Sequence, residues 1–270
     1  MSSPTQSLDF SNFAAIYERF LVGPLFQPWA QVLVARIAPA PGERVLDVAC
    51  GTGIVARTVR ARLGPAASIV GVDLSKAMLA AARQAAPDID WREGNATSLP
   101  LAAGEQFDVA FCQQGLQFVP DRPAAARELR RALVEGGRVA VATWRSDEEI
   151  PMSRQLRAIA ERHVGAIIDQ RHGFAEAEPL AALLTEAGFR DVAVQTVADT
   201  TRFDDGPLFA RLNTMALMGM SPAAKAMSEE DRAQVAARIV EDCVQQVLPR
   251  YADGTGIAFA NSANLATARA

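Results

Sequence analysis

The segment Arg44–Gly53 reads RVLDVACGTG, an apolar run followed by two closely spaced glycines. The apolar run predicts a short buried strand of a parallel sheet. A helical pattern over Ile54–Leu63 follows at once, so Gly51 and Gly53 fall in a strand-to-helix turn. Glycines at such a turn let the backbone approach a ligand closely, and the helix start offers unpaired N–H groups to an anionic group.

A second apolar run, Ser68–Val72, ends in Asp73. A carboxylate at this place typically accepts hydrogen bonds from both hydroxyls of a ribose, so the two segments together predict a cofactor that contains a nucleoside. A dinucleotide-binding turn would carry a third glycine where this chain has Ala56. Asp47 lies inside the first strand. A carboxylate there would not help to bind a pyrophosphate, but it suits a cofactor with a cationic amino-acid tail.

Leu46–Gly53 and Gly71–Ser75 together resemble the motifs of the class I S-adenosylmethionine-dependent methyltransferases. Within that class they resemble the small-molecule branch that includes the ubiquinone and menaquinone C-methyltransferases. The resemblance covers Tyr17–Trp144 well and the rest of the chain weakly. It implies S-adenosyl-L-methionine as the cofactor and a small-molecule methyl acceptor, aromatic or lipid-like.

The resemblance also implies roles for residues at the ends of the predicted strands. Asp47 would bind the cationic amino group of the cofactor, and Asp73 its ribose hydroxyls. Asn95 stands where relatives commonly carry an acidic residue, but its carbonyl can still accept a hydrogen bond from the adenine amino group. The full set of expected cofactor-binding residues is Tyr17, Asp47, Ala49, Gly51, Gly53, Asp73, Leu74, Met78, Asn95, Ala96 and Gln113.

The residue that would take a proton from the acceptor is less well defined. Gln117 stands where relatives often carry a histidine, which leaves His163 and His172 as the histidine candidates. Each of them could equally be a surface or structural histidine. Tyr17 lies in a segment that relatives fold over the cofactor and is a third catalytic candidate, or a core aromatic residue.

Composition limits the classes of partner. The chain has 270 residues, a formal net charge of −4 and no basic run, which argues against nucleic-acid binding. Its three cysteines are scattered without ligand spacing, so neither a disulfide framework nor a metal site is expected. We find no signal-peptide pattern and no apolar stretch long enough to cross a bilayer, and we expect a cytoplasmic protein. The oligomeric state, including a homodimer, stays open.

Alternating strands and helices predict a doubly wound, Rossmann-like α/β sheet of seven strands, the last of them antiparallel. Two helices, broken at Gly23-Pro24, would form an N-terminal lid. Helical patterns late in the chain would form a cap inserted between strands six and seven. The expected single domain, 1–270, therefore comprises a lid (1–40), a core (41–203 and 250–270) and a cap (204–249).

Two other functions share some of these features. A nicotinamide-dependent oxidoreductase would have the strand, the glycine turn and Asp73, but Asp47 and Ala56 count against it. A non-catalytic module that binds S-adenosylmethionine would keep the cofactor motifs without a closed acceptor cavity. Three methionines of the expected cap could line such a cavity, because methionine adapts to irregular apolar shapes, or they could simply pack helices: Met215, Met218 and Met220.

Overall fold

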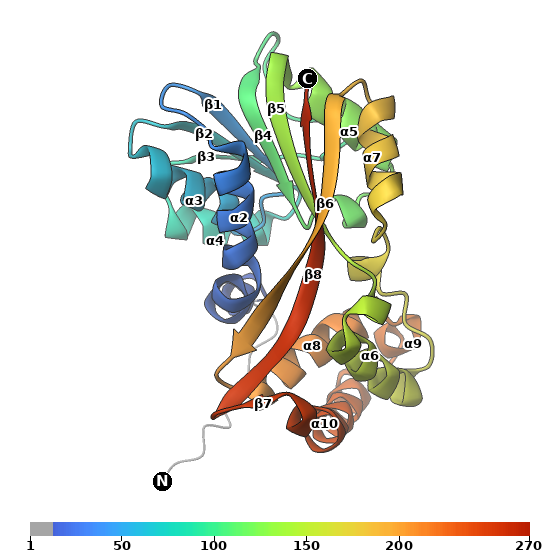
Figure 1. Cartoon of the computed structure of the whole chain (residues 1–270). Helices are drawn as coiled ribbons and strands as arrows, with labels where there is room; N and C mark the ends of the chain where they lie inside the picture. Colours follow the sequence, from blue (N-terminus) through green and yellow to red (C-terminus); the bar gives the residue numbers. More distant parts are fainter. Residues whose placement is uncertain (1–12) are drawn as a thin grey trace. The chain divides into compact units, whose positions relative to one another are not determined.

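The computed structural model describes residues 13–270. These residues form two compact units. The first comprises the described chain up to Ala142 with Leu180–Val194 and Leu265–Ala270, and the second comprises Thr143–Pro179 with Gln195–Asn264. The elements β5, β6, β8 and α7 contribute residues to both units (Figure 1). The expectation of a single domain with a lid and an inserted cap stays a proposal.

The first unit is built on a parallel sheet. Strand β1 pairs in parallel with β2 and β4, β2 pairs with β3, and β4 pairs with β5. Helix α3 packs on β1 and β2, and α4 packs on β2 and β3. The elements are α1 (Phe13–Ile16), a π-helix (Tyr17–Phe26), α2 (Gln27–Ile37), β1 (Arg44–Val48), α3 (Ile54–Leu63), β2 (Ser68–Asp73), α4 (Lys76–Ala85), β3 (Asp90–Glu93), β4 (Phe107–Gln113), α5 (Arg122–Arg131) and β5 (Leu133–Trp144).

The later elements alternate less regularly. They are α6 (Pro151–Val164), α7 (Ala177–Glu186), β6 (Arg190–Phe203), α8 (Gly206–Met220), α9 (Pro222–Lys225), α10 (Glu229–Gln246), β7 (Ala252–Asp253) and β8 (Gly256–Arg269). The helical chain between β6 and β8 is interrupted at Ser221, inside the stretch 219–222 where glycine and proline predict a break.

The strand order is β3-β2-β1-β4-β5-β8-β6, with the short β7 paired to β8. Hydrogen bonds join Gly136 and Gly137 of β5 to Ala270, and the amide of Arg145 to the carbonyl of Ser262. Because residue numbers rise along β5 while their partners' numbers fall, β8 runs antiparallel to β5. The predicted Rossmann-like sheet with a final antiparallel strand is confirmed, with β7 as an additional short strand.

The predicted helix break at Gly23-Pro24 is wrong. The chain remains helical through Pro24, as the π-helix Tyr17–Phe26. The N–H of Gln27 donates to the carbonyl of Val22, five residues back, which is the π-helical pattern. The wider turn accommodates Pro24, which lacks an N–H and would clash with the preceding turn of an α-helix. The first helix is predicted to begin at Leu8, and its residues 8–12 lie outside the described part of the chain.

Continuity through Pro24 also corrects the expectation that no apolar stretch could cross a bilayer. Phe13–Ile37 forms one helical stretch of 25 residues, long and apolar enough by length and composition to span a membrane. Its most apolar window is 33% buried in the structure, and the core helices of many proteins pass the same test. Length and composition alone therefore do not assign a membrane span.

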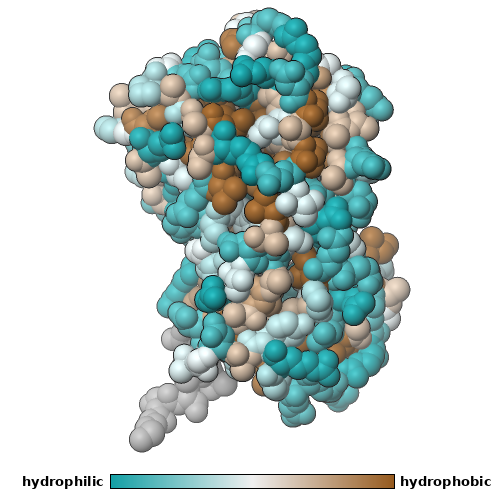
Figure 2. All heavy atoms as spheres, viewed as in Figure 1, coloured by the Kyte–Doolittle hydropathy of each residue, from teal (hydrophilic) through white to brown (hydrophobic). Residues whose placement is uncertain are grey.

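On the face drawn in Figure 2, patches of hydrophobic residues lie among hydrophilic ones.

Trp91 of β3 lies directly beneath the glycine turn. A Cβ atom built on Gly53 would come within 2.1 Å of the Trp91 ring, and one built on Gly71 within 2.3 Å. Gly53 also has φ +85°, a conformation that favours glycine. The indole Nε1 donates to the carbonyl of Ala86, so the ring is anchored as well as packed. Glycine at both positions is therefore required by the space that one indole occupies.

We predict that Gly71→Ala lowers the free energy of unfolding by about 1–3 kcal/mol, because the added methyl group overlaps a buried ring. Chemical denaturation measures the change. The control is Gly219→Ala on α8, where no atom lies within 4 Å of the added Cβ and a small stabilisation of about 0.5–1 kcal/mol is expected. Equal effects of the two substitutions would contradict the packing explanation.

Candidate active site

The glycine turn adopts an uncommon backbone conformation. Ala49, Gly51 and Gly53 have φ values of 55°, 56° and 85°. The turn is closed by the N–H of Gly53, which donates to the carbonyl of Cys50 over 2.8 Å. Alanine with positive φ costs about 1 kcal/mol or more, so other contacts must hold the turn in place.

Asp73 supplies one of these contacts from the end of β2. Its Oδ2 accepts a hydrogen bond from the N–H of Gly51 at 2.8 Å, and its Oδ1 accepts one from the N–H of Ser75 at 2.8 Å. The residue is half-buried, and each carboxylate oxygen can accept a further hydrogen bond. Asp73 can therefore hold the turn and bind two ribose hydroxyls at the same time.

Asp47 supplies the second contact from within β1. The side chain is 1% exposed, and its Oδ2 accepts a hydrogen bond from the N–H of Ala56 in the first turn of α3, at 3.1 Å. Burial raises the pKa of Asp47 to about 7, the Ala56 hydrogen bond acts in the opposite direction, and the charge of Asp73 raises it further. A cationic ligand group beside this carboxyl would favour the ionised form.

The residues expected to surround adenine lie at the ends of β2 and β3. Leu74 is 67% exposed, which is unusual for a leucine directly after a buried strand. Met78 and Ala96 are half-buried, and the N–H of Met78 donates to the Ser75 hydroxyl that caps α4. The Oδ1 of Asn95 accepts a hydrogen bond from the N–H of Thr97 at 3.0 Å and keeps one lone pair for a ligand.

The end of β4 and the loop that follows it carry buried amides. Gln113 Nε2 donates to the carbonyl of Phe26 at 3.0 Å, which ties the end of β4 to the N-terminal helix. The side-chain oxygen of Gln113, both polar side-chain atoms of Gln114 and Gln117, and the hydroxyl of Thr52 are buried and have no hydrogen-bond partner within the described chain. A buried polar atom without a partner costs about 1–3 kcal/mol, so such a cluster is typical of a surface that a ligand completes.

The N-terminal helix is fastened to this edge of the sheet. Glu18 forms an ion pair with Arg57 of α3 at 2.8 Å. The ring of Tyr17 packs against Phe26 with 5.0 Å between centroids. Burial, together with the charges of Asp73 and Glu18, raises the pKa of the Tyr17 phenol. Tyr17 therefore stays protonated near neutral pH and can donate a hydrogen bond near Asp73, but it is unsuited to act as a base.

The two histidine candidates belong to the second unit. His163 Nε2 lies 2.7 Å from Asp242 Oδ2, a contact that links α6 to α10. His172 Nδ1 lies 2.7 Å from the carbonyl oxygen of Arg145. A carbonyl only accepts hydrogen bonds, so Nδ1 carries the proton and the Nε2 of neutral His172 carries a lone pair. Burial lowers the pKa of His172, which favours this neutral form.

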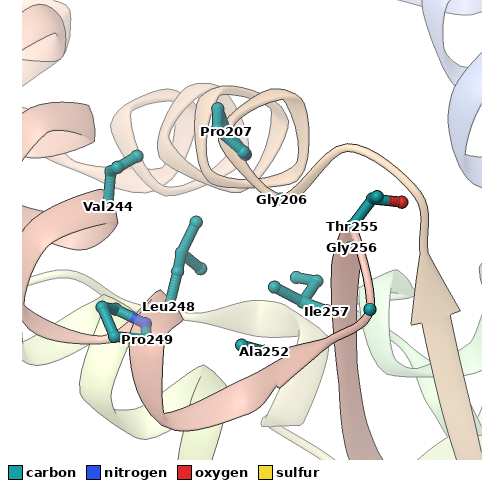
Figure 3. Close-up of a pocket in the computed structure, with 10 residues that line it drawn as sticks. Gly206, Pro207, Val244, Leu248, Pro249, Ala252, Thr255, Gly256 and Ile257 are labelled. Atoms are coloured by element: carbon teal, nitrogen blue, oxygen red, sulfur yellow. The ribbon is translucent and has the colours of Figure 1, made fainter.

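A pocket of about 260 Å³ also lies in the second unit, among the first turn of α8, the end of α10 and the β7–β8 turn (Figure 3). Pro207, Val244, Leu248 and Ile257 direct mostly apolar side chains toward it. None of the residues that line it is among the expected site residues. Of the three cap methionines, Met218 is buried at 2% exposure, as in ordinary helix packing.

The sequence predicts that residues 113–118 line the reacting centre, because ligands of open parallel sheets bind beyond the carboxyl ends of the strands. Two other features of the site were not predicted from the sequence. Trp91 gave no signal of its own, although Gly71 inside a buried strand could have indicated close packing. The Glu18 ion pair joins residues far apart in the sequence, which no local pattern shows.

Known proteins with similar sequences and structures agree with this geometry. Residues 46–141 match the family model of a methyltransferase domain. The 2-phytyl-1,4-naphtoquinone methyltransferase of Thermosynechococcus vestitus is 31% identical over 202 residues, which cover 68% of this chain and 89% of that protein. The demethylmenaquinone methyltransferase of Renibacterium salmoninarum is 29% identical over 202 residues, which cover 68% and 84%.

A solved structure of Haemonchus contortus phosphoethanolamine N-methyltransferase 2 with S-adenosyl-L-methionine has the same fold, with a TM-score of 0.57. It is 19% identical and covers 98% of this chain and 58% of that chain, so the likeness extends to the fold alone. The sequence match to the quinone methyltransferase, by contrast, shows the family.

The chain belongs to the family of S-adenosylmethionine-dependent methyltransferases. It is a small-molecule methyltransferase, and S-adenosyl-L-methionine is its cofactor. The residues present fit that group, because the unpartnered atoms of Gln113 and Thr52 and the two carboxylates match a ligand with amino, carboxylate and hydroxyl groups. Family membership also decides against the oxidoreductase alternative.

We predict that the stability of the ligand-free protein falls as the pH rises from about 4 to about 7, in part because Asp47 must lose its proton. The folded-state pKa of about 7 lies above the ordinary value of 3.8, so the folded state binds the proton more tightly. The associated stability is present at low pH and is lost as the pH rises through the folded-state pKa. Asp47→Asn should remove this part of the decline and stabilise the protein at pH 8 by about 2–4 kcal/mol.

Urea denaturation of both proteins between pH 5 and pH 8 measures this effect. Asp108→Asn provides a matched control, because Asp108 is half-buried and accepts the N–H of Arg44 at the opposite end of β1. A difference between wild type and Asp47→Asn that stays constant with pH would show that Asp47 is ionised throughout.

Proposed function

We propose that this enzyme transfers the methyl group of S-adenosylmethionine to an aromatic acceptor of the quinol class, with or without a lipid-like tail. The named activities of the two similar quinone methyltransferases support this acceptor class. The observation that carries the proposal is the combination at one sheet edge of two carboxylates that hold the turn and a loop of buried, unpartnered amides. Such an edge suits a polar nucleoside cofactor and an acceptor that carries oxygen.

When bound, the cofactor supplies a methyl group activated by its sulfonium centre. Asp47 would hold the amino group, Asp73 the ribose hydroxyls, and Gln113 with Tyr17 the amino-acid end. Leu74, Met78, Asn95 and Ala96 would surround adenine, and the exposed Leu74 would then lose its contact with water. The backbone of the turn at Ala49, Gly51 and Gly53 would approach the methionine and ribose portions.

The chain must orient the acceptor for in-line displacement and exclude water. One bond forms between the methyl carbon and the acceptor atom as the carbon–sulfur bond breaks, and the acceptor loses one proton overall. Among the candidate bases, His172 has the suitable protonation state, because its Nε2 carries a lone pair near neutral pH. His163 is paired with Asp242, and protonated Tyr17 can donate a hydrogen bond.

We predict that S-adenosylhomocysteine binds more tightly as the pH rises from 6 to 8. Its amino group stays cationic over this range and would pair with ionised Asp47, whose pKa is about 7. Affinity should change by up to about tenfold per pH unit below this pKa. Calorimetric titration measures it, with NAD as the comparison ligand, which should not bind. Asp47→Asn should bind weakly at every pH, and a pH-dependent affinity in this variant would refute the pairing.

We further predict turnover with 1,4-naphthoquinone kept in its reduced form by dithionite under nitrogen. The products should be S-adenosylhomocysteine and a ring-methylated naphthohydroquinone in equal amounts, as determined by mass spectrometry and NMR. Asp73→Ala, which lacks the ribose-binding carboxylate, serves as the inactive control. A methyl ether as the product would assign the transfer to oxygen, and the absence of any methylated product would contradict the quinol class.

A further inference from the structure

Three glutamines lie at the end of β4 and in the loop that follows it, and one of them has a structural contact. Gln113 donates to the carbonyl of Phe26. Gln114 and Gln117 are 6% and 2% exposed, and in neither side chain does the nitrogen or the oxygen have a hydrogen-bond partner within the described residues. Two neighbouring buried amides without partners are an exception among folded proteins and call for a specific explanation.

The position of these amides points to the reaction site. Gln114 directly follows β4, and its N–H donates to the carbonyl of Ala142 at 2.9 Å. Its φ is +44°, an uncommon conformation for glutamine. A Cβ built on Gly115 would lie 2.5 Å from the Cβ of Ala49, so the loop packs directly against the glycine turn. Ligands of open α/β sheets bind at the carboxyl ends of the strands, where this loop lies.

We propose that Gln114 and Gln117 bind the oxygen atoms of the methyl acceptor and orient its ring, an inference that rests on the proposed function. An amide offers a donor and an acceptor, so each glutamine can bind a hydroxyl or a carbonyl oxygen. Neither side chain titrates, so the pair positions the acceptor and does not remove its proton. Two amides suit an acceptor with more than one oxygen, such as a quinol, and discriminate against acceptors that lack oxygen.

The test uses Gln114→Met and Gln117→Met, which keep the length of the side chain and remove the amide. The control is Gln31→Met, at an exposed glutamine of α2. With reduced 1,4-naphthoquinone as the probe, each loop variant should raise KM by about tenfold or more, because the substrate oxygen loses its partner. The Kd of each loop variant for S-adenosylhomocysteine should stay within about twofold of the wild-type value. The melting temperature of each ligand-free variant should equal or exceed that of the wild type, because a buried unpaired amide is removed.

An unchanged KM in both loop variants would overturn the proposal. A parallel loss of S-adenosylhomocysteine affinity would assign the amides to the cofactor, and a lower melting temperature of the ligand-free variants would show a structural role. Either result would also overturn the proposal. The probe should also raise the melting temperature of the wild type, with S-adenosylhomocysteine present, and not that of the variants. A higher melting temperature of the wild type alone, without turnover, would refute the quinol reaction and support the amide site. An unchanged melting temperature of the wild type would overturn the inference.

Discussion

The turn between β1 and α3 depends on hydrogen bonds from its backbone to two carboxylates. Positive φ values at Ala49, Gly51 and Gly53 would be unfavourable for an isolated peptide. Asp73 holds the N–H of Gly51, and Asp47 holds the start of α3. The same two side chains are the ones expected to bind the cofactor, so ligand binding and the conformation of the turn are coupled through shared atoms.

The indole of Trp91 imposes a second constraint on the same region. Because the ring contacts Gly53 and Gly71, it fixes how closely β2 and the turn approach each other. Asp73 lies two residues after Gly71, and its contact with Gly51 depends on that approach. A side chain at either glycine would displace the ring or move the backbone that carries this contact. This explains why glycine occupies β2, where a β-branched residue would otherwise be favoured.

Local patterns predicted the parts of the fold that local chemistry determines. The strand-turn-helix unit at Gly51 was predicted. Ser75 and Asp121 stand directly before helical patterns, as N-cap residues do, and in the structure their side chains accept hydrogen bonds from the N–H groups of Met78 and Ala124. The sequence pattern predicts a strand over residues 192–197 only, whereas β6 extends over Arg190–Phe203. The pattern underestimates this strand because it ends the sheet order and most of its residues are exposed. Such a strand shows no strict apolar alternation. The histidine candidates could not be ranked from the sequence, since the tautomer of His172 depends on a carbonyl 27 residues away.

Three buried side chains carry polar groups whose interactions the protein alone does not fully satisfy: Asp47, Gln114 and Gln117. Burial of such groups lowers the stability of the ligand-free fold, and it is retained in proteins where a ligand recovers the lost interactions. Asp47 differs from the two glutamines because its cost depends on pH, whereas an amide's cost does not. A cation should therefore compensate Asp47, and uncharged oxygen atoms should compensate the glutamines. This division matches the cofactor, which carries a cationic amino group, and the proposed acceptor, which carries oxygen atoms on its ring.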